Sequence, residues 1–385
     1  MHKILTLNKI AECGIEKFPK ENFAVSPDEK NPDGIILRSY AMEEKDLTKS
    51  LLAVGRAGAG TNNIPVDKCT EKGIVVFNTP GANANAVKEL VVAGLLLSSR
   101  RVVEGIDWVR GLAGQEGIPK LVEKGKADFA GPEILGKKLG VFGLGATGGR
   151  VANACAALGM EVIGFDPYLS PDAAWSLSPS VRKAAGEDAL YAECDYLSIH
   201  APATDETKHK FGAAFFAKCK KGVRIMNFSR AELFDNDALK AAISDGTVAC
   251  YVTDFPTDDL VGFDKVIAIP HLAASTPESE DNCAAMAAEQ LREYLLYGNI
   301  KNSVNFPDNS LFYGGLRRVC VLALDGPGLA GEITAFFANK GIKMENVSIK
   351  SRGGYAYAII ETSGDCADFA SGLESVGAVI RARVL

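Results

Sequence analysis

The chain contains 385 residues, of which 47% are hydrophobic and 23% are charged, and its formal net charge at pH 7 is −6. This length exceeds what a single hydrophobic core usually supports, so two or three domains are expected. The acidic balance excludes the basic face typical of nucleic-acid-binding proteins, and the longest apolar run (90–97) is too short to cross a bilayer. We therefore expect a soluble, cytoplasmic protein without nucleic-acid or membrane partners.

The cysteines give no sign of a metal centre. Nine are present, but none forms a C-x-x-C pair and none clusters with the four histidines. Zinc sites and disulfide frameworks both require such clustering. We expect reduced, mostly buried thiols and no metal.

The first part of the chain alternates short apolar runs with polar helical segments. The runs 34–40, 51–58 and 73–80 predict strands that end in turn-forming residues, and the segments 43–50 and 65–72 between them predict helices. Strands that alternate with helices in this way form a parallel sheet.

A long helix is predicted over 84–109, and a second strand–helix series begins at 137. Another long helix is predicted over 278–296. The two long helices indicate that the chain leaves a first domain near residue 88 and returns to it near 284. The strands predicted within the second series are 161–166, 195–200, 223–229, 249–255 and 265–270.

The fold class that follows is α/β, with two Rossmann-like, doubly wound parallel sheets. Residues 1–87 and 284–306 are expected to form a flavodoxin-like substrate-binding domain, and residues 88–283 a dinucleotide-binding domain. The segment 302–315, rich in Asn, Pro and Gly, is predicted to be a linker. Residues 314–385 follow the order βαββαβ, which is the arrangement of a small ferredoxin-like α+β domain.

The segment from Gly143 to Gly148 has the pattern G-x-G-x-x-G, between an apolar strand and an Ala-rich helix. Gly143 allows a tight turn, Gly145 lets a pyrophosphate approach the backbone, and Gly148 allows the helix to pack closely on the strand. The helix opens at Ala146 and Thr147, where free N–H groups face the phosphate charge. Asp166 ends the next strand and is placed to bind the ribose hydroxyls, so the predicted cofactor is NAD rather than NADP.

Hydride exchange with a hydroxy acid also needs a proton-exchanging group and a cation for the carboxylate. Arg230 and His271 each come directly after a predicted strand, and Asp254 lies at the end of another. The carboxyl ends of parallel strands converge on one crevice, so these side chains are expected at the cofactor site.

Five ordered motifs resemble those of the D-isomer-specific 2-hydroxy acid dehydrogenases. The resemblance covers about residues 30 to 310. It implies that Arg230 orients the carboxylate and carbonyl of the substrate and that His271 gives and takes the proton. The motifs are GLGATGG with Asp166, HAPATDET (200–207), NFSRAELFD (227–235), TDFPTDDL (253–260) and PHLAAST (270–276).

The same resemblance implies further cofactor contacts and an acidic partner for the histidine. In the family this partner is normally Glu, five residues after the strand-end Asp; here that position holds Asp259, with Asp258 as the neighbouring alternative. His200 is implied to shape the cofactor site rather than to transfer protons. The residues implied to contact the cofactor are His200, Ala201, Pro202, Thr207, Asp254 and His271.

The substrate-domain motifs resemble those of the family members that act on phosphoglycerate. The resemblance implies that Arg38, with Ser39, meets a phosphate, that the backbone of Gly58, Ala59 and Gly60 meets the carboxylate, and that Asn83 is a further contact. A second arginine found in some members is replaced by Tyr40. Arg110 or Lys88 could compensate. The implied reaction is NAD-dependent oxidation of 3-phospho-D-glycerate to 3-phosphohydroxypyruvate, the first step of L-serine biosynthesis.

The segment LDGPGLAGEI (324–333) resembles the start of an ACT domain, an amino-acid-sensing module. Serine-sensing versions commonly carry His, Asn and Asn at the positions where this chain has Ala323, Asp325 and Lys343, so weak or absent serine inhibition is expected. Alternative functions are a glyoxylate or hydroxypyruvate reductase, an NAD-sensing transcriptional co-repressor and an amino-acid-binding regulator. Long apolar-faced helices favour a homodimer or a dimer of dimers.

Overall fold

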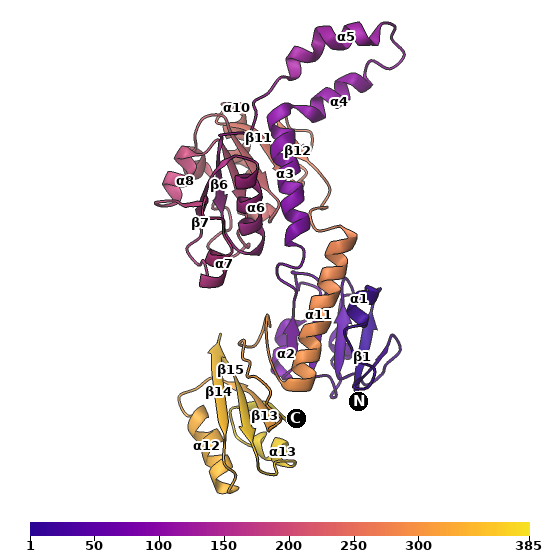
Figure 1. Ribbon diagram of the computed structural model, residues 1–385, viewed down its shortest axis with the longest axis vertical. Coiled ribbons are helices and arrows are strands. Elements are labelled where there is room, and N and C mark those ends of the chain that lie inside the picture. The colour runs from indigo at the N-terminus through magenta and orange to yellow at the C-terminus, as the bar shows by residue number, and fades with distance from the viewer. The chain divides into compact units, whose positions relative to one another are not determined.

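A computed structural model describes residues 1–385, and the chain divides into two compact units. Unit 1 contains residues 1–83 and 277–385, and unit 2 contains residues 84–276. The crossings fall just before helices α3 (Ala84–Arg100) and α11 (Pro277–Tyr297), rather than within them near residues 88 and 284. The predicted fold class is confirmed, because two parallel sheets are followed by a small antiparallel one (Figure 1).

Unit 1 is built on a five-stranded parallel sheet with the order β2-β1-β3-β4-β5. The sequence predicted β3, β4 and β5 but neither β1 nor β2, because these short segments contain polar residues and lack flanking turn signals. In place of the helix predicted over 43–50, the structure has only the 3₁₀ turn η1 (Glu44–Asp46). The turn is followed by Leu47, whose side chain is buried. The remaining elements of this part of the unit are β1 (His2–Leu7), α1 (Glu12–Ile15), β2 (Phe23–Ser26), β3 (Gly34–Leu37), β4 (Ala53–Arg56), α2 (Val66–Glu71) and β5 (Val75–Phe77).

Helix α11 corresponds to the long helix predicted over 278–296, and it packs on this sheet. Its buried face includes Ala287, Leu291 and Leu295. A Cβ atom on Gly55 of β4 would lie 2.9 Å from Leu291 Cδ1, so the glycine allows the helix to approach the sheet closely.

Unit 2 is built on a seven-stranded parallel sheet with the order β12-β11-β10-β9-β6-β7-β8. All of the strands predicted from 137 onward are present, and the two-residue strand β8 is added at one edge. Hydrophobic clusters fill both faces of the sheet, as a doubly wound fold requires. The strands are β6 (Lys138–Phe142), β7 (Glu161–Phe165), β8 (Arg182–Lys183), β9 (Tyr196–Ile199), β10 (Val223–Asn227), β11 (Val248–Thr253) and β12 (Val266–Ala268), and the helices that follow them are α6 (Ala146–Ala157), α7 (Pro171–Trp175), α8 (Glu187–Glu193), α9 (Ala213–Phe216), η3 (Ala231–Leu233) and α10 (Asn236–Ser244).

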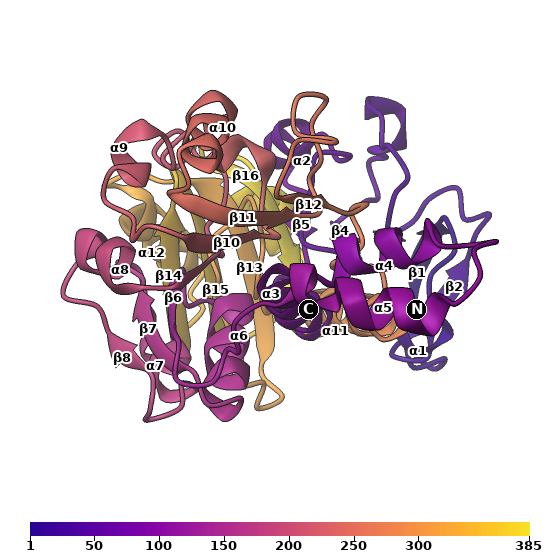
Figure 2. The same ribbon diagram turned by 90° about the horizontal axis from the view of Figure 1, so that it is seen from above.

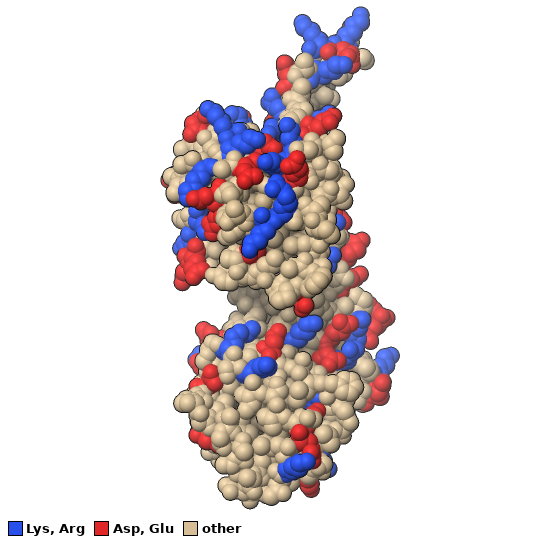
Figure 3. All heavy atoms as spheres, turned by 60° about the vertical axis from the view of Figure 1, so that its left-hand side comes forward, with Lys and Arg blue, Asp and Glu red and all other residues tan.

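The helix predicted over 84–109 is broken, and the part after the break forms an arm. Arg101 has a left-handed backbone (φ 46°), which ends α3 and starts α4 (Val102–Arg110) in a new direction. Helix α5 (Ile118–Gly125) and the 3₁₀ turn η2 (Lys126–Phe129) return the chain toward the domain. Figures 1 and 2 show α4 and α5 beside each other beyond the end of α3, and Figure 3 shows charged side chains gathered at the far end of this arm.

The C-terminal part of unit 1 has the predicted βαββαβ order, with the strands arranged β14-β15-β13-β16. Helices α12 and α13 cover one face of this sheet. The other face packs on the first core of unit 1, where Tyr357 contacts Tyr294 of α11 and Tyr355 contacts Phe306. No helix of the chain combines the length and apolar character needed to cross a membrane. The elements are β13 (Arg317–Leu324), α12 (Leu329–Asn339), β14 (Asn346–Arg352), β15 (Tyr355–Thr362), α13 (Phe369–Leu373) and β16 (Val379–Val384).

The segment 302–315 does not behave as a simple exposed linker. Phe306 and Asn309 are buried, and Asn309 Nδ2 donates to the carbonyls of Ser348 and Tyr357, at 3.0 Å each. A polar sequence of this kind is typical of loops, but its amides here satisfy the backbone of two neighbouring elements.

Candidate active site

The strands of unit 2 end in register along one edge of the sheet. Phe142, Ile199, Asn227, Thr253 and Ala268 are successive partners across β6, β9, β10, β11 and β12. Adjacent strands lie about 4.8 Å apart, so the residues that follow these positions are brought to a common edge. The sequence places there the glycine motif, His200, Arg230, Asp254 and His271.

The glycine motif has the conformation that a dinucleotide requires. Gly143 has φ +87°, and a Cβ atom on it would lie 2.6 Å from the His200 carbonyl oxygen. A Cβ atom on Gly148 would lie 1.8 Å from the Gly143 oxygen, whereas Gly145 faces open space, with no atom within 4 Å. Helix α6 then starts at Ala146, and no side chain caps its N–H groups. The open approach at Gly145 fits a pyrophosphate held by these backbone amides.

Asp166 is fixed beside this loop at the end of β7. Its two carboxylate oxygens accept hydrogen bonds from the backbone N–H groups of Leu144 and Tyr168, both at 2.8 Å. The carboxylate lines a cavity of about 520 Å³ that has room for an adenosine group. Arg182 and Lys183 line the same cavity, which the sequence did not indicate.

The predicted cofactor contacts between 200 and 207 form a turn after β9. Burial lowers the pKa of His200 to about 4, and its Nε2 lies 2.8 Å from Ser198 Oγ. The imidazole is therefore neutral near pH 7. Ala201 is buried, and Thr207 Oγ1 donates to the Pro202 carbonyl at 2.6 Å, which fixes the turn.

Arg230 and His271 both lie close to the ring of Phe255. The guanidinium carbon of Arg230 is 5.9 Å from the Phe255 ring centre, and the His271 ring centre is 4.5 Å from it. Asn227 Nδ2 donates to the Arg230 carbonyl at 2.9 Å and so holds the backbone of that residue. Both Arg230 and His271 are exposed and available to a ligand. Phe255 and Asn227 had not been predicted as site residues, since only their contacts reveal them.

The carboxylate of Asp254 is near enough to this pair to be influenced by their charges. It is fully buried; Oδ2 accepts the Ala273 N–H at 3.1 Å, and Oδ1 has no hydrogen-bond partner. Burial raises the pKa of Asp254, and the nearby charges of His271 and Arg230 act in the opposite direction. A buried carboxylate close to two cationic groups is the arrangement that orients and charges an imidazole.

Asp259, the expected acidic partner, is not joined to His271 in this structure. Its carboxylate accepts from Lys240 Nζ at 2.9 Å, Asn236 Nδ2 at 3.0 Å and Thr257 Oγ1 at 2.8 Å. These donors, the lysine first, lower the pKa of Asp259 to about 2. Its side chain is one methylene shorter than Glu, and three local donors hold it. Asp258 is exposed and has no hydrogen bond to the imidazole either.

The predicted substrate residues of unit 1 also follow strand ends. Arg38 and Ser39 come after β3, and Arg38 Nη1 forms an ion pair with Glu280 Oε1 at 2.7 Å. Gly58 follows β4 with φ +146°, and a Cβ atom on it would lie 1.8 Å from Arg56 Nη1. The guanidinium of Arg56 therefore lies directly against the 58–60 loop, a cation that the sequence reasoning had not included.

The rest of that loop is held by neighbouring polar groups. Asn78 Nδ2 donates to the Ala59 carbonyl at 2.6 Å, and the Thr79 N–H donates to the Gly58 carbonyl at 3.1 Å. Asn83 ends this unit directly before α3. Neither proposed substitute for the second arginine is free: Lys88 contacts Glu89, and Arg110 pairs with Asp107 on the arm.

Comparison with protein families identifies unit 2. Residues 92–273 match the model of the D-isomer specific 2-hydroxyacid dehydrogenase NAD binding domain. Most of unit 2 is therefore a D-isomer specific 2-hydroxyacid dehydrogenase NAD binding domain. NAD is the cofactor of this domain family, and the glycine loop and Asp166 fit it.

Individual relatives extend the similarity over most of the chain. It is 33% identical over 306 residues to D-3-phosphoglycerate dehydrogenase of Methanocaldococcus jannaschii, a match that covers 76% of this chain and 56% of that protein. It is 32% identical over 325 residues to D-3-phosphoglycerate dehydrogenase of Bacillus subtilis, covering 80% and 59%. The chain thus spans less than two thirds of the length of these relatives. The crystal structure of NAD⁺-bound 3-phosphoglycerate dehydrogenase from Entamoeba histolytica superposes with a TM-score of 0.60 at 26% identity, covering 79% of this chain and 98% of that one.

The position of Asp166 predicts the cofactor preference. Asp166→Ala should weaken NAD binding by roughly ten- to a hundredfold, because hydrogen bonds from the ribose to a carboxylate are lost. NADP binding should improve relative to NAD, since Arg182 and Lys183 line the same cavity. Fluorescence titration with both reduced cofactors measures the change, and Asp172→Ala on the exposed start of α7 is the control. Equal affinity of the wild-type protein for NADP and NAD would contradict this role.

Proposed function

We propose that the chain oxidises 3-phospho-D-glycerate to 3-phosphohydroxypyruvate with NAD. The observation that carries this proposal is the grouping of Arg230, Phe255 and His271 near the buried carboxylate of Asp254, at the strand edge that also bears the dinucleotide loop. The named relatives support the choice of substrate. The cations Arg38 and Arg56 at the strand ends of unit 1 support a doubly anionic substrate.

Each side chain has a defined role in this reaction. Arg230 binds the carboxylate and the oxygen on C2 of the substrate, because its planar guanidinium suits paired oxygen acceptors. The unprotonated imidazole of His271 takes the hydroxyl proton in the oxidation and returns it in the reverse direction. Asp254 stabilises the resulting imidazolium. The glycine loop and Asp166 would hold NAD, which would supply the acceptor for the hydride of C2.

Glu280 has to release Arg38 if that arginine is to bind phosphate. Both side chains are close to half exposed, at 42% and 45%, so the ion pair is solvent-screened and weak. A phosphate dianion can therefore compete for the guanidinium. Reduction of glyoxylate or hydroxypyruvate is the second candidate activity. These substrates carry no phosphate, so such an enzyme would not need the charge of Arg38.

A steady-state assay of the purified chain tests this function. His271→Ala should lower kcat for 3-phosphoglycerate by about two to four orders of magnitude, the range for loss of a general acid–base group. NAD binding should persist. His209→Asn is the matched control, because His209 is exposed in the same unit and Asn tolerates its left-handed backbone. No turnover of 3-phosphoglycerate by the wild type, or a His271→Ala variant with normal kcat, would refute the proposal.

We also propose that the protein is a homodimer formed through the α4–α5 arm. Val102, Ile106 and Val109 of α4 are 40%, 46% and 47% exposed on one side of a helix that projects from the domain. An adjoining, mostly apolar cavity of about 460 Å³ includes Trp108 and Phe129. Apolar surface of this kind on a projecting element usually contacts another subunit, and two-fold association is the commonest way to cover it.

The arm can be tested without altering the site. Ile106→Asp should convert dimers to monomers in sedimentation velocity, because an unpaired carboxylate would be buried in the contact. Gln115→Asp adds the same charge to the loop between α4 and α5 and should leave the dimer intact. A wild-type monomer, or an unchanged dimer in Ile106→Asp, would exclude this interface.

Two of the C-terminal residues that differ from those of serine-sensing ACT domains already contact other side chains of this domain. Asp325 accepts a hydrogen bond from Ser351 Oγ at 2.9 Å, and Lys343 Nζ lies 2.6 Å from Glu345 Oε2. Ala323 is buried. These contacts support our proposal that serine is a poor ligand for this domain.

A further inference from the structure

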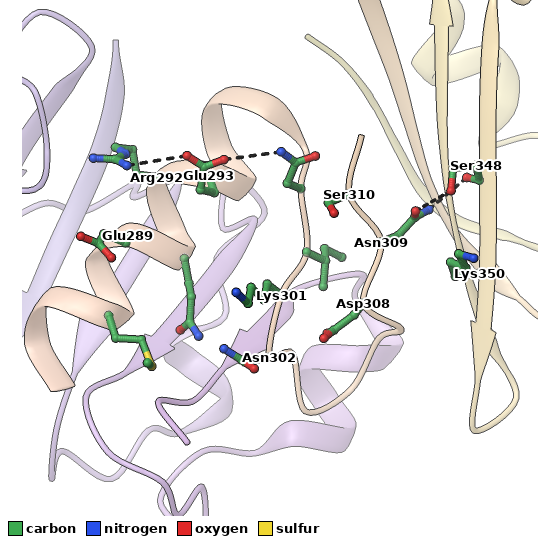
Figure 4. Close-up of a pocket in the computed structure, with 14 residues that line it drawn as sticks. Glu289, Arg292, Glu293, Lys301, Asn302, Asp308, Asn309, Ser310, Ser348 and Lys350 are labelled. Atoms are coloured by element: carbon green, nitrogen blue, oxygen red, sulfur yellow. Dashed lines mark hydrogen bonds and ion pairs between the residues drawn. The ribbon is translucent and has the colours of Figure 1, made fainter. Parts of the chain in front are cut away.

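A polar pocket lies within unit 1, and none of the residues assigned to catalysis lines it. Its volume is about 920 Å³, within the range of small-molecule sites. The walls come from the second half of α11, the segment between 299 and 310, and strand β14 of the C-terminal sheet (Figure 4). A ligand here would contact both the first and the C-terminal sheet domains of the unit.

Gln290 is the strongest sign that this pocket is a binding site. Its side chain lines the pocket and is only 7% exposed, yet neither Nε2 nor Oε1 has a hydrogen-bond partner. Nearly all buried amides in proteins are hydrogen-bonded, because an unpaired polar group loses its hydration without compensation. An amide left unpaired in the wall of a pocket is suited to a ligand that both accepts and donates.

The charges around the pocket indicate which ligand it takes. Two acidic side chains are already neutralised: Glu289 pairs with Lys17 at 2.8 Å, and Glu293 pairs with Arg292 at 3.6 Å. Lys301 and Lys350 form no ion pair with any residue of the chain, nor does Asp308, so the unpaired groups carry one net positive charge. Figure 4 shows Lys301 and Lys350 reaching the pocket from different elements, the chain that leaves α11 and strand β14.

We propose that this pocket binds a small organic anion, a metabolite carrying phosphate or carboxylate groups. The ammonium groups of Lys301 and Lys350 hold the anionic oxygens, and the amide of Gln290 binds a neutral polar group of the same molecule. Lysine suits this role because its compact charge binds such oxygens without demanding bidentate geometry. Binding links α11 to β14 and therefore stabilises the docking of the C-terminal sheet on the first core.

Isothermal titration of the full chain with citrate and with inorganic phosphate tests the proposal and separates the two sources of negative charge. The double variant K301Q/K350Q should weaken binding of the preferred anion at least about tenfold, because charge-assisted hydrogen bonds are lost. Gln290→Leu should weaken citrate, which carries a hydroxyl group, more than phosphate. Thermal unfolding of each variant without ligand confirms that it folds.

Two controls separate this pocket from other anion sites. K20Q/K340Q removes the same charge from exposed positions of unit 1 and should bind as the wild type does. Arg38→Ala should also bind normally, whereas loss of binding in this variant alone would place the anion at the proposed substrate site and overturn the pocket. Absence of binding to the wild type, or equal loss in K20Q/K340Q, would overturn it as well. None of these outcomes bears on turnover of 3-phosphoglycerate.

Discussion

The carboxylate of Asp254 is the group on which the geometry of the candidate active site depends. It is completely buried and accepts one hydrogen bond, from the Ala273 N–H, which fixes the loop directly after His271. A buried carboxylate without neighbouring positive charge is strongly destabilising. Arg230 and His271 supply that charge from two other strand ends. The buried carboxylate of Asp254 therefore favours an arrangement in which the proposed substrate-binding cation and the proposed base lie close together.

A second buried charge organises unit 1. Arg318 of β13 is fully buried and forms an ion pair with Glu361 at 2.8 Å. It also donates to the carbonyls of Tyr297, at the end of α11, and Leu311, at 2.6 and 2.8 Å. Arg383 of β16 stacks 4.0 Å from the Tyr294 ring centre. Removing one partner of such a buried pair costs roughly 3–5 kcal/mol, so these arginines fasten the C-terminal sheet to α11. The proposed anion pocket lies beside this junction, where a ligand can act on it.

Most of the architecture could be predicted because strands, turns and the glycine motif are each marked by residues close together in the sequence. Apolar strands that end in turn formers located β3 to β5 and the strands of unit 2, and the spacing from Gly143 to Asp166 located the dinucleotide loop. The break at Arg101 was missed because apolar residues at helical spacing, Val102, Ile106 and Val109, continue beyond it, and only a left-handed backbone ends the helix. Strands β1 and β2 lacked a clear pattern.

The sequence could indicate which residues belong to the candidate site, but it could not indicate which of them contact one another. Spacing alone favoured Asp259 as the partner of His271, yet spacing carries no information about competing donors. The carboxylate of Asp259 is already hydrogen-bonded to Lys240 and Asn236, both on α10. The approach of Arg56 to Gly58 and the unpaired amide of Gln290 likewise depend on elements far apart in the chain. Such features follow from packing, which a local pattern does not encode.

We propose that Asp254, rather than Asp259, supports the pair formed by Arg230 and His271. The most direct test of this proposal is the pH dependence of kcat/KM for 3-phosphoglycerate oxidation in Asp254→Asn and Asp259→Asn. Our account predicts a loss of at least about tenfold, with a changed pH profile, in Asp254→Asn, because the imidazolium loses its buried counter-charge. Asp259→Asn should stay within about twofold of the wild type, since its contacts are local and exposed. A large loss in Asp259→Asn together with a normal profile in Asp254→Asn would contradict the account.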